Sequence, residues 1–383
     1  MEKYINRAIK DAFLKKMTPN KVLLLLGARR VGKTSFIEHF INDNIKEPVL
    51  ELYGEDMSTA EILKQRTVEN YKRLMGKHKV LIIDEAQKIQ DIGQILKLMV
   101  DKIDGIKIIA TGSSVFDLAN QLGEPLTGRK VTFNLYPLAQ MEYSEEENIV
   151  QTKSLLEERL IYGNYPELLK YDSYEEKAAY LNELVNSYLL KDILEHDGIK
   201  NSAKLINLLR LLAFQIGKEV SLEELGRQLG MSRSSVERYL DLLSKVFVIY
   251  KVSGFSRNLR KEITKTSRWY FYDNGIRNTL IANFNPIALR NDIGELWENY
   301  LLSERIKYQQ YSGMIVNNYF WRTYYQQEID WIEEREGNLF AYEIKWKDKK
   351  VKVPSAWKDA YPDSEYSVIS QDNYLNFITR PIE

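Results

Sequence analysis

The sequence predicts an α/β protein that begins with a parallel sheet and continues into a second α/β region. Three observations lead to this prediction. Two short apolar runs, residues 23–26 and 80–83, have the composition of strands that are buried on both faces. The first run leads into a glycine-framed turn and then a helical pattern, and the second ends in two acids. Near the C-terminus, three segments alternate apolar and polar residues as half-buried strands do.

Length and composition limit the classes of protein. A chain of 383 residues predicts two to four domains of about 100–200 residues each. Its apolar runs are far shorter than the roughly 20 residues that span a bilayer, and its first residues lack the apolar core of a signal peptide. The absence of cysteine excludes disulfides and thiolate chemistry, and these features together predict a cytoplasmic protein. A net charge of zero predicts that any DNA contact depends on a local patch.

The turn after the first strand has the residues of a P-loop. Its nine residues are Gly27, Ala28, Arg29, Arg30, Val31, Gly32, Lys33, Thr34 and Ser35, and apolar residues then recur at helical spacing. The two glycines allow a turn whose N–H groups face one anion at a helix N-terminus. Lys33 is expected to reach the β- and γ-phosphates, and Thr34 to hold Mg²⁺. The alternative is a chance glycine turn before a helix.

Two acids follow the second buried strand, about 55 residues after the turn. In an open α/β sheet, ligands bind at the carboxyl ends of the strands, where Asp84 and Glu85 are expected to lie. Asp84 is predicted to hold Mg²⁺ through water, and Glu85 to polarise the water that attacks the γ-phosphate.

Two further positions are candidates for the same site. Ser113, with Thr111 as a substitute, ends the next predicted strand, where a hydroxyl can sense the γ-phosphate or the attacking water; the alternative is a serine-rich turn that caps a helix. Arg129 precedes the last strand of the core, and is either an arginine finger for a neighbouring subunit or an exposed structural residue. No Asn-Lys-x-Asp motif for guanine is present, so ATP is favoured over GTP.

Several motifs together resemble one family. Gly-Ala-Arg-Arg-Val-Gly-Lys-Thr, Ile-Asp-Glu-Ala-Gln, Thr-Gly-Ser-Ser and Leu-Thr-Gly-Arg occur in that order, and Tyr-Gly-Asn-Tyr-Pro-Glu and Tyr-Asp-Asn-Gly come later. This series is similar to the prokaryotic AAA-type ATPases that carry a C-terminal domain of unknown function. The resemblance implies an AAA+-like P-loop ATPase core at residues 1–150, a helical lid at 151–200, a winged helix at 201–275 and a nuclease-like domain at 276–383.

The expected winged helix contains the candidate DNA contacts. Residues 218–268 hold eleven Lys or Arg and six Asp or Glu, a net charge of +5 that favours phosphate binding. Helix-turn-helix geometry would present the third helix to a groove, and a basic loop between two strands would form the wing. The predicted contacts are Arg233, Ser234, Arg238, Arg257, Arg260 and Lys261. The alternative is that this region contacts protein instead.

The C-terminal region resembles the PD-(D/E)XK nucleases. A helical Glu298, then Asp330 on one strand, and then Glu343 and Lys345 on the next strand reproduce that constellation. Carboxylates on adjacent strands can hold one or two Mg²⁺ ions, while a lysine orients water or stabilises charge. Fold does not fix activity, so a phosphate- or peptide-binding remnant is the alternative.

These expectations combine into one hypothesis and two rivals. The hypothesis is a Mg²⁺-dependent ATPase that acts on DNA, with a metal-dependent nuclease-like domain. The first rival is an ATP-driven switch that binds protein and has no nuclease activity, and the second is a DNA-binding regulator with a slow ATPase. A homo-oligomer is a further expectation, because Arg129 can act as a finger only if subunits meet.

Overall fold

The computed structural model describes residues 4–113, 126–189, 202–256, 267–323, 325–348 and 350–379. These residues form two compact units. The N-terminal unit comprises Asn6–Pro137 together with Lys245–Phe247, and the C-terminal unit comprises the remaining described residues. Each unit contains its own sheet, so the α/β class predicted from the sequence is confirmed. The finer division into four domains stays a prediction.

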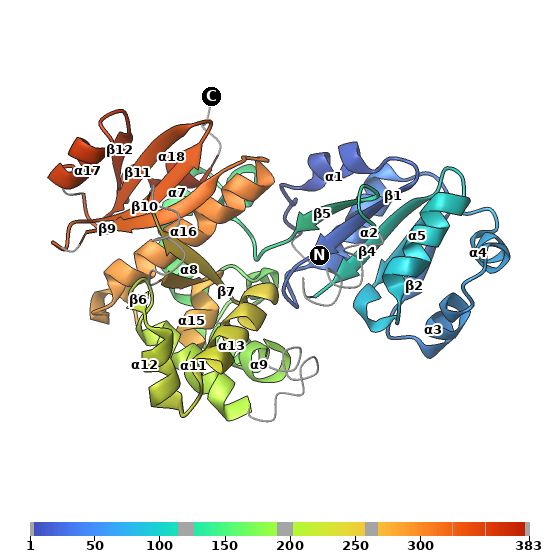
Figure 1. The fold of residues 1–383 in the computed structure, drawn as a ribbon, viewed down its shortest axis with the longest axis horizontal. Helices are drawn as coiled ribbons and strands as arrows, with labels where there is room; N and C mark the ends of the chain where they lie inside the picture. Colours follow the sequence, from blue (N-terminus) through green and yellow to red (C-terminus); the bar gives the residue numbers. More distant parts are fainter. Residues whose placement is uncertain are drawn as a thin grey trace. The chain divides into compact units, whose positions relative to one another are not determined.

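The N-terminal unit is built on five parallel strands in the order β2-β3-β4-β1-β5 (Figure 1). Strands β1 and β3 are the two apolar runs of the sequence, and both are almost fully buried. Because every strand runs in the same direction, all carboxyl ends meet at one edge of the sheet. The strands are β1 (Lys21–Leu26), β2 (Val49–Tyr53), β3 (Val80–Asp84), β4 (Lys107–Gly112) and β5 (Lys130–Asn134).

Helices cover this sheet through apolar faces. Phe13 of α1 (Lys10–Lys16) contacts Phe36 and Phe40 of α2 (Lys33–Asn44), and also Phe133 of β5, with ring centroids 5.0–5.3 Å apart. This aromatic group fixes the start of α2 against the sheet, directly after the glycine turn. The other helical segments of the unit are α3 (Met57–Lys64), α4 (Val68–Met75), η1 (Ala86–Lys88) and α5 (Ile92–Lys102).

The C-terminal unit begins with helices. They are η2 (Gln140–Glu145), α7 (Ile149–Ser154), α8 (Leu156–Tyr162), η3 (Pro166–Lys170), α9 (Tyr174–Glu183), the π-helical η4 (Leu184–Leu189) and α11 (Ser202–Phe214). Next come α12 (Leu222–Leu229) and α13 (Arg233–Lys245). Ser221 caps α12 by accepting a hydrogen bond from the N–H of Glu224, and Ser232 accepts one from the N–H of Ser235 at the start of α13.

A mixed sheet of seven strands completes this unit, in the order β12-β11-β10-β9-β7-β8-β6. Its strands are β6 (Glu219–Val220), β7 (Ile249–Gly254), β8 (Ser267–Phe271), β9 (Asn317–Arg322), β10 (Glu328–Arg335), β11 (Asn338–Ile344) and β12 (Glu365–Ile369). Strand β7 pairs with β9, so the strands on either side of residue 275 belong to one sheet. Helices α15 (Asn274–Leu280), η5 (Ile287–Leu289), α16 (Ile293–Tyr311), α17 (Ser355–Ala360) and α18 (Tyr374–Ile378) accompany these strands.

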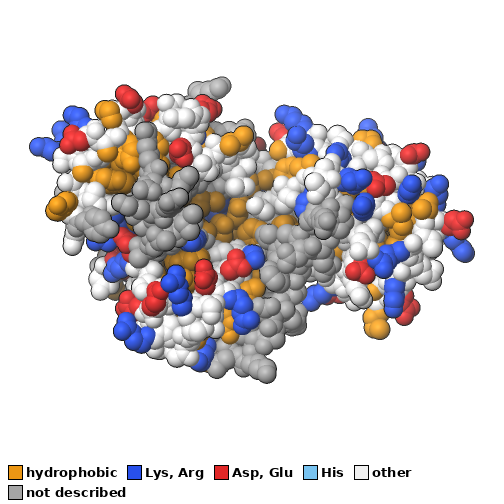
Figure 2. Space-filling view, in the orientation of Figure 1, with side chains coloured by type: hydrophobic (Ala, Val, Ile, Leu, Met, Phe, Trp, Pro, Cys, Tyr) orange, Lys and Arg blue, Asp and Glu red, His pale blue; other side chains and the backbone are white. Residues whose placement is uncertain are grey.

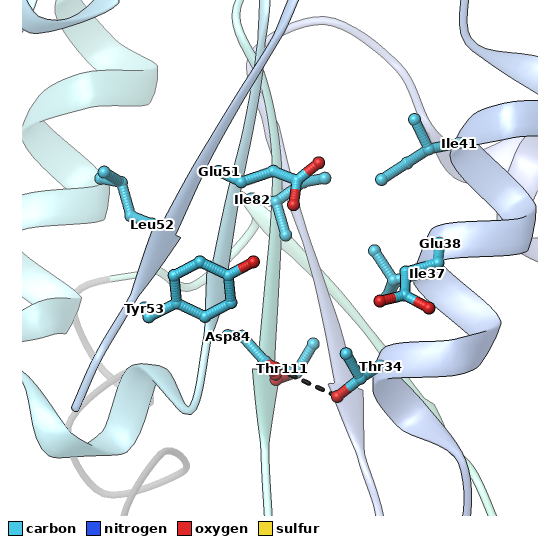
Figure 3. A pocket seen from close by; sticks show the side chains of 10 residues that line it. All are labelled: Thr34, Ile37, Glu38, Ile41, Glu51, Leu52, Tyr53, Ile82, Asp84 and Thr111. Atoms are coloured by element: carbon cyan, nitrogen blue, oxygen red, sulfur yellow. Dashed lines mark hydrogen bonds between the residues drawn. The ribbon is translucent and has the colours of Figure 1, made fainter. Parts of the chain in front are cut away.

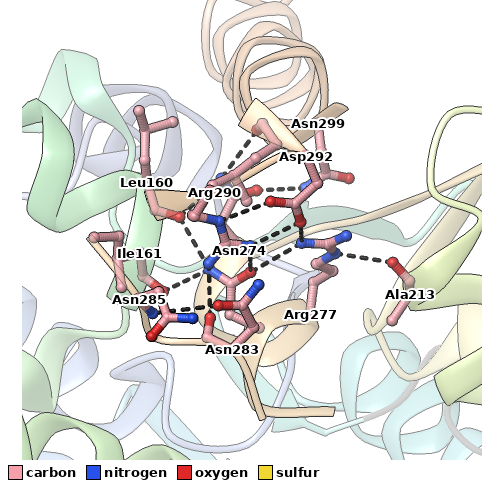
Figure 4. Close-up of polar contacts among 12 residues, drawn as sticks. Leu160, Ile161, Ala213, Asn274, Arg277, Asn283, Asn285, Arg290, Asp292 and Asn299 are labelled. Carbon is pink, nitrogen blue, oxygen red and sulfur yellow. Dashed lines mark hydrogen bonds and ion pairs between the residues drawn. The ribbon is translucent and has the colours of Figure 1, made fainter. Parts of the chain in front are cut away.

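A buried polar network joins several helices of the C-terminal unit (Figure 4). Asp292 accepts hydrogen bonds from Arg277 at 2.5 Å and from Arg290 at 2.8 Å. Arg277 also donates to the carbonyl of Ala213 in α11, at 2.9 Å. A buried guanidinium is costly unless it is paired, so these contacts fix α11, α15 and the start of α16 together.

The described residues include no helix that is long and apolar enough to cross a membrane.

Candidate functional site

Two positions of the glycine turn require glycine, one because of its backbone conformation and the other for lack of space. Gly32, which precedes α2, has φ +89°, in the left-handed region. A Cβ atom on Gly27 would lie 2.1 Å from the carbonyl oxygen of Leu135, so no larger residue fits there. The turn therefore follows the end of β1 closely and enters α2 with its N–H groups at the helix N-terminus, where an anion is favoured.

Lys33 and Thr34 lie where the turn becomes a helix. The buried Lys33 ammonium donates to the carbonyl oxygens of Gly27 and Ala28, at 2.9 and 3.1 Å. The Thr34 hydroxyl is 3.1 Å from a carboxylate oxygen of Asp84. The structure thus brings together the lysine, hydroxyl and carboxylate that the sequence selects at positions 33, 34 and 84.

The residues that follow Asp84 form a polar network with the end of β4. Thr111 donates from its hydroxyl to Asp84 and accepts a hydrogen bond from the N–H of Glu85. Glu85 has φ +51° and accepts from the amide of Gln87 at 2.5 Å. The same amide nitrogen lies 3.2 Å from the hydroxyl of Ser113. Of these residues, Gln87 received no role in the sequence analysis, although it follows Glu85 by only two positions.

A small pocket opens beside Thr34 and Asp84, between α2 and strands β2 and β3 (Figure 3). Glu38, Glu51 and Tyr53 also line it. In the close-up, the Thr34 hydroxyl points toward Asp84 and Thr111. Carboxylates and hydroxyls therefore predominate among the polar groups at this end of the site.

Arg7 is a residue near the turn that sequence reasoning missed. Its side chain is buried, and it donates to the carbonyl of Val31 at 2.8 Å and to that of Tyr136 at 2.6 Å. These bonds hold the middle of the glycine turn against the segment that follows β5. No motif marks Arg7, since it lies 24 residues before its partner in the turn.

Arg129 lies at the other edge of the sheet. It precedes β5, its carbonyl accepts a hydrogen bond from the N–H of Val22 at the start of β1, and its guanidinium pairs with Asp101 at 2.6 Å. The glycine turn follows the carboxyl end of β1, so Arg129 is separated from it by the length of the strand. A role as a finger for a neighbouring subunit stays a prediction.

The C-terminal unit brings Asp330, Glu343 and Lys345 together. The Lys345 ammonium is 2.6 Å from Glu343 and 3.8 Å from Asp330. Asp330 on β10 also accepts a hydrogen bond from the N–H of Ile344, at 2.8 Å. We call Glu298, Asp330, Glu343 and Lys345 the carboxylate cluster.

Burial and mutual repulsion raise the proton affinity of these acids. Burial, followed by the charge of Asp330, raises the pKa of Glu298 to about 8 and that of Glu343 to about 7. Burial also raises the pKa of Asp330. Burial lowers the pKa of Lys345, but the negative charges of Asp330 and Glu343 outweigh it, and the net shift is upward. The nearby cations Lys345 and Arg268 therefore do not offset the effect of burial on the pKa values of these acids.

Three further residues at the cluster were not selected from the sequence. Tyr270 on β8 donates to Glu298 at 2.7 Å. Arg268, two positions earlier, donates to Glu328 at 2.9 Å and lies 3.9 Å from Asp330. An arginine directly before the aromatic residues Trp269, Tyr270 and Phe271 of β8 is a signal that could have indicated a buried acidic partner.

The cluster retains polar atoms that the described residues do not satisfy. One carboxylate oxygen of Glu343 and the hydroxyl of Tyr366 are buried without a hydrogen-bond partner among the described residues. No three acidic, histidine or cysteine side chains in the described ranges are arranged to hold a metal ion. Mg²⁺ is commonly held by one or two carboxylates and several waters, so Asp330 and Glu343 are a sufficient protein contribution.

The predicted DNA contacts on α13 are exposed, but each has a partner within the protein. Arg233 forms an ion pair with Glu223 at 2.6 Å, Ser234 lies 3.0 Å from the hydroxyl of Ser232, and Arg238 lies over the ring of Tyr239. The basic residues Arg257, Arg260 and Lys261 lie outside the described residues. On the face shown in Figure 2, blue and red side chains are interspersed. Much of the positive charge predicted for residues 218–268 is therefore paired with acids or lies outside the described part.

Family comparisons divide the chain into three segments. A model described as an AAA domain matches residues 19–144. Models of two domains of unknown function, DUF8612 and DUF4143, match residues 153–286 and 293–377. Residues 19–144 are therefore similar to an AAA domain and residues 293–377 to the DUF4143 domain, in the order that the resemblance in the sequence implies.

Similar whole chains come from bacteria and archaea. An uncharacterized protein of Mycobacterium tuberculosis is 25% identical over 329 residues, which cover 85% of this chain and 70% of that protein. An uncharacterized protein of Methanocaldococcus jannaschii is 24% identical over 383 residues, which cover 94% and 82%.

Solved structures show a weaker likeness. A signal transduction ATPase with numerous domains from Pyrococcus horikoshii aligns with 82% of this chain at 13% identity and a TM-score of 0.33, and the chain spans about half of its length, 48%. DnaA from Aquifex aeolicus, bound to AMPPCP, aligns with 62% of this chain and 86% of its own, at 16% identity and a TM-score of 0.31.

Proposed function

We propose that this protein binds and hydrolyses ATP with Mg²⁺ at the glycine turn, and acts on DNA through a winged helix and a PD-(D/E)XK-like domain that cleaves it. The observation that carries the ATPase proposal is the placement of Lys33, Thr34 and Asp84 at one end of a parallel sheet. The Lys33 ammonium is bonded to carbonyls of its own turn, and these are the bonds that it would exchange for phosphate oxygens.

The residues present fit a magnesium nucleotide. The Thr34 hydroxyl and the Asp84 carboxylate, 3.1 Å apart, are the hard oxygen donors that Mg²⁺ prefers. Mg²⁺ would supply charge neutralisation on the β- and γ-phosphate oxygens. The glycine turn would orient the triphosphate with its N–H groups, and Lys33 would balance its charge.

Glu85 is the group proposed to orient the attacking water. It follows Asp84 directly, at the edge of the sheet where the γ-phosphate would lie. Its carboxylate is held by Gln87, which also contacts Ser113. Ser113 and Glu85 are thus joined through one amide, and Thr111 supports both Asp84 and the backbone of Glu85.

The cleavage proposal rests on the carboxylate cluster. Asp330 and Glu343 lie on neighbouring antiparallel strands, and Lys345 contacts both. The unsatisfied oxygen of Glu343 fits a cation at this position. A divalent ion there would polarise a phosphodiester and lower the pKa of its bound water. Asp330 and Glu343 would hold the ion, Lys345 would orient the water or stabilise developing charge, and Tyr270 would keep Glu298 in place.

DNA is the partner proposed for the helices α11, α12 and α13 with strands β7 and β8. Exposed Arg233, Ser234 and Arg238 occupy the first half of α13, where a recognition helix meets the bases. The contacts proposed for Arg257, Arg260 and Lys261 lie outside the described residues.

Parallel assays test this proposal. ATP turnover and cleavage of plasmid and branched DNA would be measured with Mg²⁺ and Mn²⁺ for the wild type, Lys33→Ala and Asp330→Ala. We expect Lys33→Ala to lose ATP turnover, and Asp330→Ala to lose cleavage while retaining ATP turnover. Cleavage that survives Asp330→Ala would remove the carboxylate cluster from the proposal.

A switch without cleavage is the second candidate, and one observation favours it. Lys345, Arg268 and Tyr270 already provide counter-charges and hydrogen bonds to the acids of the cluster. An acidic group that protein cations partly neutralise can be a structural remnant, and ATP would then change only a DNA- or protein-binding surface. ATP turnover without DNA cleavage under any metal would favour this candidate.

A further inference from the structure

Arg268 is a buried arginine, the second residue of strand β8, beside the carboxylate cluster. Only 4% of the residue is exposed, and its guanidinium lies over the ring of Phe320 at 4.5 Å. Its Nε is buried without a hydrogen-bond partner among the described residues. Because a buried guanidinium that is incompletely bonded is costly, this arrangement calls for a reason beyond packing.

The partner of Arg268 lies at the boundary with solvent. Glu328, whose carboxylate is 2.9 Å from one terminal nitrogen of Arg268, has a side chain that is 48% exposed. The other terminal nitrogen is 3.9 Å from Asp330, which is longer than a hydrogen bond. Among the described residues, the half-exposed Glu328 is thus the hydrogen-bonded acidic partner of this guanidinium, two residues before Asp330 on the same strand.

We propose that Arg268 binds a DNA phosphate beside the carboxylate cluster. In the absence of DNA, the Glu328 carboxylate occupies the position of that phosphate, and a phosphodiester displaces it. The inference rests on the proposed action on DNA and names one phosphate contact within it. A guanidinium matches two phosphate oxygens as well as it matches a carboxylate. Strand β8 belongs to the segment before residue 275, so this contact would make the site depend on both sides of that proposed domain boundary.

The ion pair between Arg322 and Glu219 is a matched control. It has the same length, 2.9 Å, and likewise joins an arginine on a strand of the mixed sheet to a glutamate on another strand. Its arginine side chain is 38% exposed, whereas that of Arg268 is 5% exposed. Glu219 lies opposite Arg268, and Arg322 lies opposite Glu328, on neighbouring strands. The control pair therefore lies in the same part of the sheet and differs from the tested pair in the burial of its arginine.

The test measures binding of a fluorescein-labelled hairpin DNA to the full chain in EDTA, where no cleavage occurs, over a series of salt concentrations. Arg268→Gln should weaken binding about tenfold and lower the salt dependence by about one phosphate contact. Glu328→Gln should strengthen binding about threefold, because the competing charge is gone. Arg322→Gln and Glu219→Gln should each stay within about twofold of the wild type.

The opposite effects of Arg268→Gln and Glu328→Gln on DNA affinity distinguish a ligand contact from a structural role. If Arg268 only supports the fold, Arg268→Gln and Glu328→Gln would both weaken binding or leave it unchanged, and either result would overturn the inference. If Arg268→Gln does not fold, the DNA affinities of Glu328→Gln and Arg268→Lys are compared instead, after thermal melting has shown that both variants are folded. Stronger binding by Glu328→Gln still supports the inference, and weaker or unchanged binding still overturns it.

Adding Mn²⁺ to the same samples then separates the two proposals. Opposite effects on binding without any cleavage would overturn the nuclease proposal and retain the inference. Cleavage by the wild type, together with equal DNA affinities of the Arg268 and Glu328 variants, would retain the nuclease proposal and overturn the inference. No DNA binding by the wild type would overturn both.

Discussion

The glycine turn and the carboxylate cluster are built in different ways. The turn consists of nine consecutive residues, and its shape is set by the backbone, through the positive φ of Gly32 and the close approach of Gly27 to Leu135. The cluster consists of side chains from helix α16, strands β10 and β11 and the residue that follows β11, and Arg268 and Tyr270 of β8 contact it through an ion pair and a hydrogen bond. A backbone-built site tolerates changes in side chains outside it, whereas a side-chain-built site depends on how several elements pack.

The largest expected effect is the loss of ATP turnover on removing one side chain of the turn. Lys33→Ala should lower turnover about 10²- to 10³-fold, because a positioned cation on a transferring phosphoryl group is lost. Binding of hairpin DNA should not change. Steady-state ATPase assays and fluorescence anisotropy measure the two quantities, and an equal loss of both would contradict the separation of the two sites.

The second prediction concerns the packing on which the cluster depends. Asp292→Ala should lower the free energy of unfolding by about 3 kcal/mol, since it leaves Arg277 and Arg290 buried without their shared carboxylate. Chemical denaturation, followed by the fluorescence of tryptophans in the mixed sheet, would measure the loss. Glu51→Ala, a change on a strand of the other sheet, is the control and should cost far less.

The ion pairs of Asp292 with Arg277 and Arg290 also predict how the free energy of unfolding depends on pH. Burial raises the pKa of Asp292, but hydrogen bonds from Arg290 and Arg277 outweigh it and lower the pKa below 3.8. The stabilisation is therefore fully present above pH 3.8 and is lost as the pH falls through the lowered pKa. Between neutral pH and strong acid, the wild type should lose more stability than Asp292→Asn. Equal acid sensitivity would contradict this account of the pair.

A third prediction tests the backbone of the turn. Gly32→Ala should weaken ATP binding about tenfold, because the left-handed conformation costs a residue with a Cβ atom about 1–2 kcal/mol. Gly105→Ala is the matched control: Gly105 has a similar φ of +75°, no atoms lie near its added Cβ, and it precedes β4 at the edge far from the turn. Equal ATP affinities for the two variants would argue against a backbone-built site.

The smallest effect is expected at Gln87. Gln87→Ala should lower kcat of ATP hydrolysis about fivefold and leave KM unchanged, because Glu85 loses one positioning hydrogen bond while the nucleotide contacts remain. Gln94→Ala, which removes an exposed amide on α5, should change neither constant. A rise in KM for Gln87→Ala would place that residue in nucleotide binding instead.

The difference between the sites also explains what the sequence could predict. The turn, strand β3 and the caps at Ser221 and Ser232 depend on neighbours within a few residues, so they could be read from local spacing. Arg7, Tyr270 and Arg268 act on partners that are 24, 28 and 60 residues away. Nothing in their local sequence specifies those partners, because the partners meet only when the strands pair.

The one-sheet arrangement of the C-terminal unit was likewise not predicted. Alternation indicated β9, β10 and β11 as strands, and the hairpin β7–β8 was expected as part of a separate domain. The parallel pairing of β7 with β9 depends on residues some 66 positions apart, Ser253 and Tyr319. Local periodicity gives the faces of a strand but not the identity of its neighbour.

Titration calorimetry with a non-hydrolysable ATP analogue and Mg²⁺ tests the central claim most directly. We predict saturable binding to the wild type and to Asp330→Ala with the same affinity, and a large loss of affinity for Lys33→Ala. Absence of binding to the wild type, or equal binding to Lys33→Ala, would contradict the assignment of the glycine turn as the nucleotide site.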